Sequence, residues 1–300
     1  MKNILLQTTI EHDDNDWAIE RFSLLKAHLE GLQDETGEVA FRVTARNRDP
    51  LPQDDSVLSR LHESDVDQLW LFAVDTGHGL TANDCEGISR FRRRGGALMV
   101  TRDHMDLGSS VCTLGGVGAA HHFHSQNPEP DPSRHCIDDR ETTYISWPNY
   151  HSGANGDYQD VFVEGPAHAV LADPESETGV IRFLPAHPHE GAVSAPPDDP
   201  SARVILRGKS QTTGRDFNVA VAFEASNEGG RAIAQSTFHH FADYNWDVQA
   251  GCPSFVSEAP GSKMLAFPEA LRSTHRYVRN LAFWLSEHPR TTGASRETSP

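Results

Sequence analysis

Apolar residues along the first 110 positions gather in short runs that polar residues separate. The runs have the length of strands and cover residues 4–8, 41–44, 69–74 and 97–101. Two intervening segments carry apolar side chains at helical spacing, one through Phe22, Leu25 and Leu29 and the other through Ile88 and Phe91. This alternation predicts an α/β fold with a doubly wound, mostly parallel sheet and helices on both faces.

The second of these helices has recognisable ends in the sequence. Thr81 and Asp84 have the spacing of a capping box, and the pair Gly95–Gly96 would end the helix just before the next strand. We therefore expect a helix between these two points.

The second half of the chain begins with a loop-rich insertion at about residues 115–200, dense in Gly, Pro, Asn and Asp. Its strand candidates are short, at residues 144–147 and 180–184, so we interpret it as an elaboration of a site rather than a second domain. Strand patterns then return, and a C-terminal helix follows. We expect a single domain over residues 1–288 and a disordered tail at 289–300.

Composition excludes several classes of protein. The 300 residues carry a formal net charge of -17, which disfavours a nucleic-acid partner because phosphate binding depends on Lys and Arg. No apolar run approaches the roughly 20 residues of a membrane helix, and no signal peptide opens the chain, so a cytoplasmic protein is expected. The cysteines show no paired CxxC spacing, which argues against a zinc knuckle. Homo-oligomers are common in such folds, but no apolar stripe identifies an interface.

Histidines and acids follow the strand-like runs. Asp75 and His78 follow one run, Asp103 and His104 the next, and a late run leads to His239 and His240. In open α/β folds the carboxyl ends of the strands form the ligand crevice. These side chains are therefore candidates for chemistry.

A metal site is the sharper interpretation of these histidines. The segment His121-His122-Phe123-His124 would project His122 and His124 to the same side if extended. His104 and either His239 or His240 would join them from neighbouring strand ends. The predicted ligands are His104, His122, His124 and His239, around a divalent ion, with zinc or iron favoured.

Acid–base and substrate-binding residues are predicted around that centre. Asp103 beside His104 could orient its ring or act as a base, or could instead cap a helix. The predicted catalytic residues are His104, Asp103 and His240. Aromatic side chains near amides suit a sugar or another small polar ring, although buried packing explains Trp more often than ligand stacking does. The predicted substrate-binding residues are Asp75, His78, Trp147, Tyr150 and Tyr244.

Three ordered motifs resemble the ThuA-like (trehalose-utilisation) family of the class I glutamine-amidotransferase-like superfamily. They are the glycine pair, strand and histidine at residues 95–104, Gly115-Gly116 followed by His121-His122, and Gly230-Arg231 leading to residues 238–240. The resemblance implies a flavodoxin-like fold, a polar pocket at the strand ends and an association with sugar metabolism.

The same resemblance argues against one activity. Glutamine-hydrolysing relatives carry a nucleophilic cysteine at the turn after the strand that corresponds to residues 97–101, with His and Glu as its partners. Here this turn reads Arg102-Asp103-His104-Met105, so the thiol is missing. The segment His187-Pro188-His189-Glu190 resembles the relatives' His-Pro-Glu signature, but the cysteine that such a histidine would activate is missing. A cysteine-dependent glutaminase is therefore not expected.

The sequence as a whole predicts a metal-dependent hydrolase, lyase or isomerase that acts on a small polar, sugar-like substrate. Two alternatives stay open. One is a metal-free hydrolase that uses His104 or His240 with Asp103 as an acid–base pair. The other is a noncatalytic subunit that binds a small molecule.

Overall fold

The computed structural model describes residues 1–114, 116–139 and 142–287, and the predicted tail at 289–300 lies outside these ranges. Its main sheet has eight strands in the order β2-β1-β3-β4-β12-β11-β10-β7. The parallel strands are β2 (Phe41–Arg46), β1 (Lys2–Thr8), β3 (Gln68–Phe72), β4 (Ala97–Thr101) and β12 (Ala232–Gln235). The antiparallel strands are β11 (Asp216–Phe223), β10 (Ala202–Lys209) and β7 (Phe162–Val163). The predicted mostly parallel α/β sheet is confirmed.

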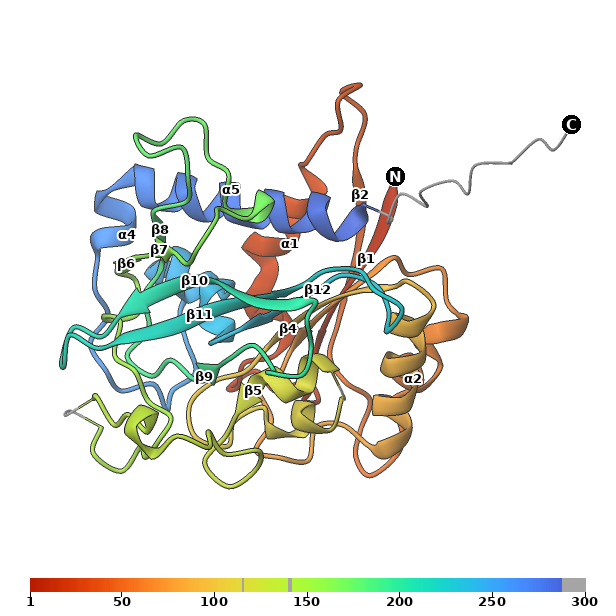
Figure 1. Cartoon of the computed structure of the whole chain (residues 1–300), viewed down its shortest axis with the longest axis horizontal. Helices are drawn as coiled ribbons and strands as arrows, with labels where there is room; N and C mark the ends of the chain where they lie inside the picture. The colour runs from red at the N-terminus through yellow and green to blue at the C-terminus, as the bar shows by residue number, and fades with distance from the viewer. Residues whose placement is uncertain (115, 140–141, 288–300) are drawn as a thin grey trace, which may run out of the picture.

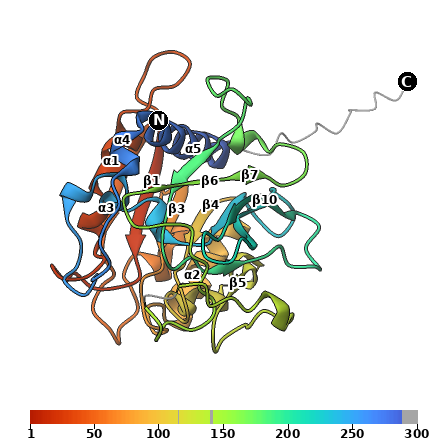
Figure 2. The same cartoon turned by 90° about the vertical axis from the view of Figure 1, so that its left-hand side faces the viewer.

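Helices cover both faces of this sheet (Figures 1 and 2). Helices α1 (Ser23–Glu30) and α5 (Pro268–Ser286) lie on one side, and α2 (Ala82–Arg93) lies on the other. The strands between them are apolar at successive positions because each pleat buries a side chain under one layer or the other. In β3, for example, Trp70 belongs to the core under α1 and α5, whereas Leu69 and Leu71 belong to the core under α2.

The insertion consists of short elements rather than one loop. Strands β5 (His121–His122) and β9 (Ala192–Val193) pair antiparallel, as do β6 (Tyr158–Asp160) and β8 (Phe183–Pro185). Strand β8 confirms part of the strand expected at 180–184. The strand expected at 144–147 is wrong, because the N–H of Ile145 bonds to the carbonyl of Thr142 and closes a turn there.

Short helices complete the chain. The first predicted helix is shorter than its periodicity indicates, because its start is the 3-10 turn η1 (Ile19–Phe22). The other short helices are η2 (Leu58–Glu63), η3 (Ser109–Thr113), η4 (Gly116–Ala120), η5 (Pro132–Arg134), η6 (Ala169–Leu171), η7 (Phe238–His240), α3 (Asp243–Trp246), η8 (Val248–Ala250) and α4 (Lys263–Ala266).

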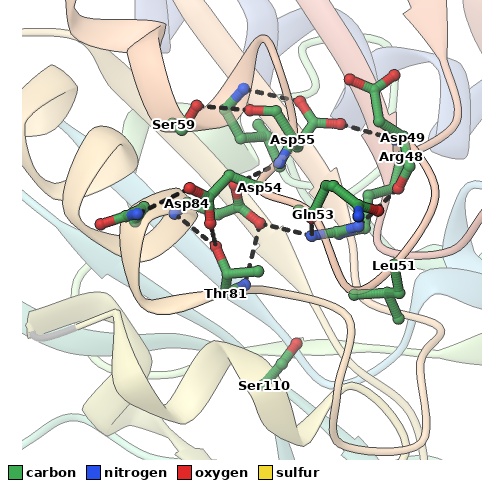
Figure 3. A network of polar contacts seen from close by, with 12 residues as sticks. Arg48, Asp49, Leu51, Gln53, Asp54, Asp55, Ser59, Thr81, Asp84 and Ser110 are labelled. Carbon is green, nitrogen blue, oxygen red and sulfur yellow. Dashed lines mark hydrogen bonds and ion pairs between the residues drawn. The ribbon is translucent and has the colours of Figure 1, made fainter.

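A buried ion pair joins the segment after β2 to the start of α2 (Figure 3). Arg48 Nη2 lies 2.9 Å from Asp84 Oδ2, and both side chains are 0% exposed. The other carboxylate oxygen of Asp84 accepts the backbone N–H of Asp55 at 2.8 Å. Asp84 also forms the predicted capping box with Thr81, which is confirmed. One carboxylate therefore fixes two segments and a helix end.

We predict that Asp84→Asn lowers the free energy of unfolding by about 3 kcal/mol, because it leaves the buried guanidinium of Arg48 without a countercharge. Urea denaturation of both proteins measures this difference. Asp54→Asn is the matched control, since Asp54 is exposed in the same network and bonds to Thr81 and Asn83. A loss no larger than that of the control would show that the ion pair contributes little.

Two histidines stack where α1 meets α5. The rings of His28 and His275 lie 4.3 Å apart at an interplanar angle of 16°, and both contact Trp246 edge-on. Burial and, to a smaller extent, the neighbouring His28 lower the pKa of His275 to about 4. Burial also lowers the pKa of His28. The fold therefore favours the neutral rings.

The lowered pKa of His275 predicts acid destabilisation. Its folded-state pKa of about 4 lies below the ordinary value of 6.5, so its contribution is complete above pH 6.5 and is lost as the pH falls toward 4. We expect His275→Gln to flatten the dependence of the urea midpoint on pH in this window. His78→Gln, which changes an exposed histidine, should leave the dependence as it is in the unaltered protein. An unchanged dependence in His275→Gln would contradict the prediction.

Candidate functional site

The site lies where three segments of the chain meet at the carboxyl end of the sheet. Asp103 and His104 directly follow β4, and His239 lies in η7, just after β12. Because β4 and β12 are parallel neighbours, their ends lie side by side. The insertion supplies His187 and His189 from the segment after β8.

Asp103 is the centre of a cluster of imidazoles. Its carboxylate oxygens lie 3.0 Å from His104 Nδ1, 3.3 Å from His187 Nε2 and 3.9 Å from His239 Nε2. The rings of His187 and His239 are stacked, with centroids 3.6 Å apart and an interplanar angle of 13°. Asp103, His187 and His239 are all buried. Asp103, His104 and His187 can each direct one ligand atom to a common point.

A chain of amides fixes which nitrogen of each stacked ring carries hydrogen. Asn245 donates from Nδ2 to the backbone carbonyl of Ala186 at 3.0 Å, and a carbonyl can only accept. The oxygen of Asn245 is therefore the atom that faces His239 Nδ1, at 2.9 Å. The same Nδ2 also donates to Asn155 Oδ1, and this oxygen lies 2.9 Å from His187 Nδ1. Both histidines thus donate from Nδ1.

The Nε2 atoms of His187 and His239 therefore each carry a lone pair near the Asp103 carboxylate. A neutral imidazole that donates from Nδ1 has a lone pair on Nε2. In His187 and His239 this lone pair is directed toward the carboxylate of Asp103. His187 Nε2 is buried and has no hydrogen-bond partner among the described residues. Acceptors that face one another in a buried site require a proton or a metal cation between them.

Burial lowers the pKa of both stacked imidazoles, whereas contacts with imidazoles lower the pKa of the carboxyl group beside them. Burial lowers the pKa of His187 to about 4, although Asp103 opposes this shift. Burial, together with the adjacent His187, holds the pKa of His239 well below its ordinary value. Burial alone would raise the pKa of Asp103, but the neighbouring His187 and His104 outweigh it and hold that pKa well below its usual range. The Thr237 hydroxyl also donates to Asp103, at 3.1 Å.

A fourth histidine, His189, lies beside the Asp103 cluster, between two carboxylates. Its Nε2 is 3.0 Å from Glu258 Oε1, and its Nδ1 is 3.4 Å from Asp139 Oδ2. The hydrogen bond with His189 lowers the pKa of Glu258 to about 2. The centroid of His189 lies 5.1 Å from that of His104. A group that can carry a proton is therefore next to the Asp103 cluster.

Both clusters open into one cavity of about 340 Å³. This volume is at the lower end of the range for small-molecule sites. Its polar lining is Asp16, Thr76, Asp103, His104, Asn155, His187, His189, His239 and Glu258. Its apolar lining is Trp17, Val74, Leu107, Tyr144, Ile145, Phe238, Phe255 and Val256. The cavity therefore presents charged groups, imidazoles and apolar rings, and the rings of Trp17 and Phe238 lie against His239.

Some of the predicted site residues line this cavity. Asp103, His104 and His239 do, and they come together as the strand ends predict. His240 does not line it. Its ring is buried and its Nε2 lies 3.3 Å from Glu190 Oε1, in a polar network that also contains Ser152.

The two other predicted ligands lie away from the cavity, and the expected pairing of His122 with His124 needs correction. His122 is buried against Asn127 and Ser194, where its nitrogens lie 2.9 Å from the carbonyl of the first and 2.6 Å from the hydroxyl of the second. His124 is exposed and approaches the carbonyl of Trp147 at 3.2 Å. Strand β5 ends at His122, so the extended geometry that would align the two rings is absent.

The predicted substrate-binding residues also lie outside this cavity. Asp75 accepts the hydroxyls of Thr9 and Ser110 in a turn. His78 is exposed. The aromatic residues Trp147, Tyr150 and Tyr244 are buried, and their partners include the ring of His135, the ring of Phe217 and Cys252, respectively.

The structure adds residues that the sequence interpretation missed. These are His187, His189, Asn155, Asn245, Asp139 and Glu258. The sequence carried a signal for the two histidines in His187-Pro188-His189-Glu190, but that motif was considered only as the partner of a cysteine. We find no comparable signal for the asparagines and acids.

Comparisons with known proteins give matches to solved structures at low sequence identity. No family model and no curated protein matches the chain. Solved structures that resemble it include a protein described as ThuA-like from Bacteroides uniformis, with TM-score 0.44, 12% identity and 91% of each chain covered. The glutaminase domain of Trypanosoma brucei CTPS with bound acivicin has TM-score 0.46 and 14% identity, over 97% of this chain and 98% of that one. The mmIFT52 N-terminal domain has TM-score 0.49 and 11% identity, over 95% of this chain and 97% of that one.

Structures described as ThuA-like and as a glutaminase domain are therefore among the matches, at TM-scores of 0.44 and 0.46. At these identities, function has to be inferred from the cavity itself. Within the described residues, no helix is both long and apolar enough to span a membrane.

The amide chain predicts a specific tautomer. We expect nitrogen-detected NMR of the metal-free protein at neutral pH to show a hydrogen on Nδ1 of both His187 and His239, because both Nδ1 atoms face an amide oxygen. Spectra of His187→Gln and His239→Gln assign the signals. An Nδ1 without a hydrogen on either ring would contradict the arrangement.

Proposed function

We propose that the chain is a metal-dependent hydrolase or lyase that acts on a small polar substrate. Asp103, His187 and His239 hold a divalent ion in this proposal. The observation that carries it is the direction of the two Nε2 lone pairs, which the amide chain fixes toward a buried carboxylate. A metal cation supplies the positive charge that this arrangement calls for.

The donor set suits zinc or iron. Two imidazoles and one carboxylate are ligands that both ions accept, with positions left for water or substrate. His104 is a candidate for a further ligand, since it lies against the same carboxylate. A bound divalent ion would polarise an oxygen of the substrate or lower the pKa of a bound water.

The surrounding residues perform the remaining steps. Asn155 and Asn245 keep both ligand rings in one orientation, as hydrogen-bond partners of metal-binding histidines commonly do. His189 is the group placed to carry a proton to or from the substrate, because Glu258 and Asp139 hold its ring at the cavity wall.

A metal-free function remains a second candidate because of one contact. His104 Nδ1 lies 3.0 Å from Asp103 Oδ2, the arrangement in which a carboxylate orients a histidine base. In that case a proton, rather than a metal, lies between Asp103 and one stacked imidazole. The two candidates differ in metal content, so a single measurement separates them.

Elemental analysis of the purified protein tests the proposal. We expect about one zinc or iron ion per chain, loss of this ion in His187→Ala and His239→Ala, and an affinity about 10- to 100-fold lower in Asn245→Leu. His122→Ala is the matched control, because it removes a buried histidine outside the cavity. It should keep its metal, as should His189→Gln.

Two results would contradict the proposal. One is a folded protein that takes up no zinc or iron when these ions are supplied, which would leave the acid–base candidate. The other is metal that His122→Ala loses and His187→Ala retains, which would move the site to β5.

A further inference from the structure

The mouth of the cavity carries two exposed aromatic rings. Tyr144 is 80% exposed and Phe255 is 57% exposed, and both line the cavity. Among the described Phe, Tyr and Trp residues, these are the ones that are more than half exposed. Their exposure at one cavity, in a chain of net charge -17, is not explained by packing.

Apolar character continues from the mouth toward the interior. Trp17 and Phe238 line the same cavity but are buried, at 6% and 1% exposed, and their rings lie 5.4 Å apart. Trp17 meets the ring of His239 edge-on, with centroids 4.7 Å apart. The cavity that Tyr144 and Phe255 line therefore also has apolar rings in its interior, and these lie against the imidazole of His239.

The residues at the mouth are also connected to His189. Tyr144 and Phe255 come from two distant segments, and the hydroxyl of Thr142 joins these segments by donating to Glu258 Oε1 at 2.9 Å. The same oxygen lies 3.0 Å from His189 Nε2. A ligand that contacts the rings at the mouth therefore lies against the segments that hold His189.

We propose that the substrate of this cavity has a polar end and a flat apolar face, and that the flat face packs on Tyr144 and Phe255 while the polar end reaches Asp103 and His187. This inference rests on the proposed function, whose site it shares. An aryl ring and the C–H face of a sugar ring offer the same chemistry to an aromatic side chain. The small volume of the cavity limits the ligand to a small molecule.

Three probes test this inference and distinguish the two kinds of face. Methyl β-D-glucopyranoside offers only a sugar face, benzyl alcohol only an aryl face, and phenyl β-D-glucopyranoside offers both. We expect saturation-transfer NMR and calorimetry to detect binding of at least one probe, with saturation strongest on the protons of its flat face. Tyr144→Ala and Phe255→Ala should each raise the dissociation constant about fivefold.

Phe162→Ala is the matched control, since Phe162 is a partly exposed ring on β7 that does not line the cavity. It should leave the dissociation constants unchanged. Failure of all three probes to bind at their solubility limits, or binding that neither variant at the mouth weakens, would overturn the inference.

Each probe is measured with both chelator-treated and metal-supplied protein. Binding that depends on Tyr144 and Phe255 in a protein that takes up no metal would support this inference and refute the proposed function. A protein that binds metal but none of the probes would support the proposed function and refute this inference.

Discussion

The limited number of hydrogens on a neutral imidazole is the constraint on which the site depends. Asn245 donates to the carbonyl of Ala186, and this hydrogen bond fixes the orientation of its amide. The amide orientation of Asn155 and the tautomers of His187 and His239 are then fixed as well. Their remaining lone pairs must then face the buried carboxylate of Asp103. A charged group buried among acceptors is costly unless a cation compensates it. The backbone carbonyl of one alanine thus determines the chemistry that Asp103 can support.

The fold brings these groups together from parts of the chain that are far apart. Parallel pairing of β4 with β12 places Asp103 and His239 at one edge, because both follow strand ends. The insertion brings His187 to the same place through the pairing of β6 with β8. The insertion is therefore part of the site, because it supplies His187.

Sequence alone predicted the sheet and half of the histidine cluster, for a common reason. Buried strands are recognisable as apolar runs, and the residues that follow such runs lie at the carboxyl edge of the sheet. This reasoning placed His104 and His239 at the same edge, where both line the cavity. The same reasoning failed for His122 and His124, because β5 spans only two residues and its partner β9 directs His122 toward Ser194. Asn155 and Asn245 could not be predicted, since their role comes from three-dimensional contacts between segments with no distinctive spacing.

The segment His187-Pro188-His189-Glu190 shows how one change at a turn can alter the role of its neighbours. Beside a cysteine, a histidine in this segment would have a thiol to activate. Here the turn after β4 offers a carboxylate and an imidazole instead, and His187 directs a lone pair at that carboxylate from 3.3 Å. An imidazole cannot take a proton from a group that is already ionised, so in the proposed function His187 is a metal ligand or shares a proton. The fold alone does not decide the reaction, because the residue at the turn after β4 decides what His187 can do.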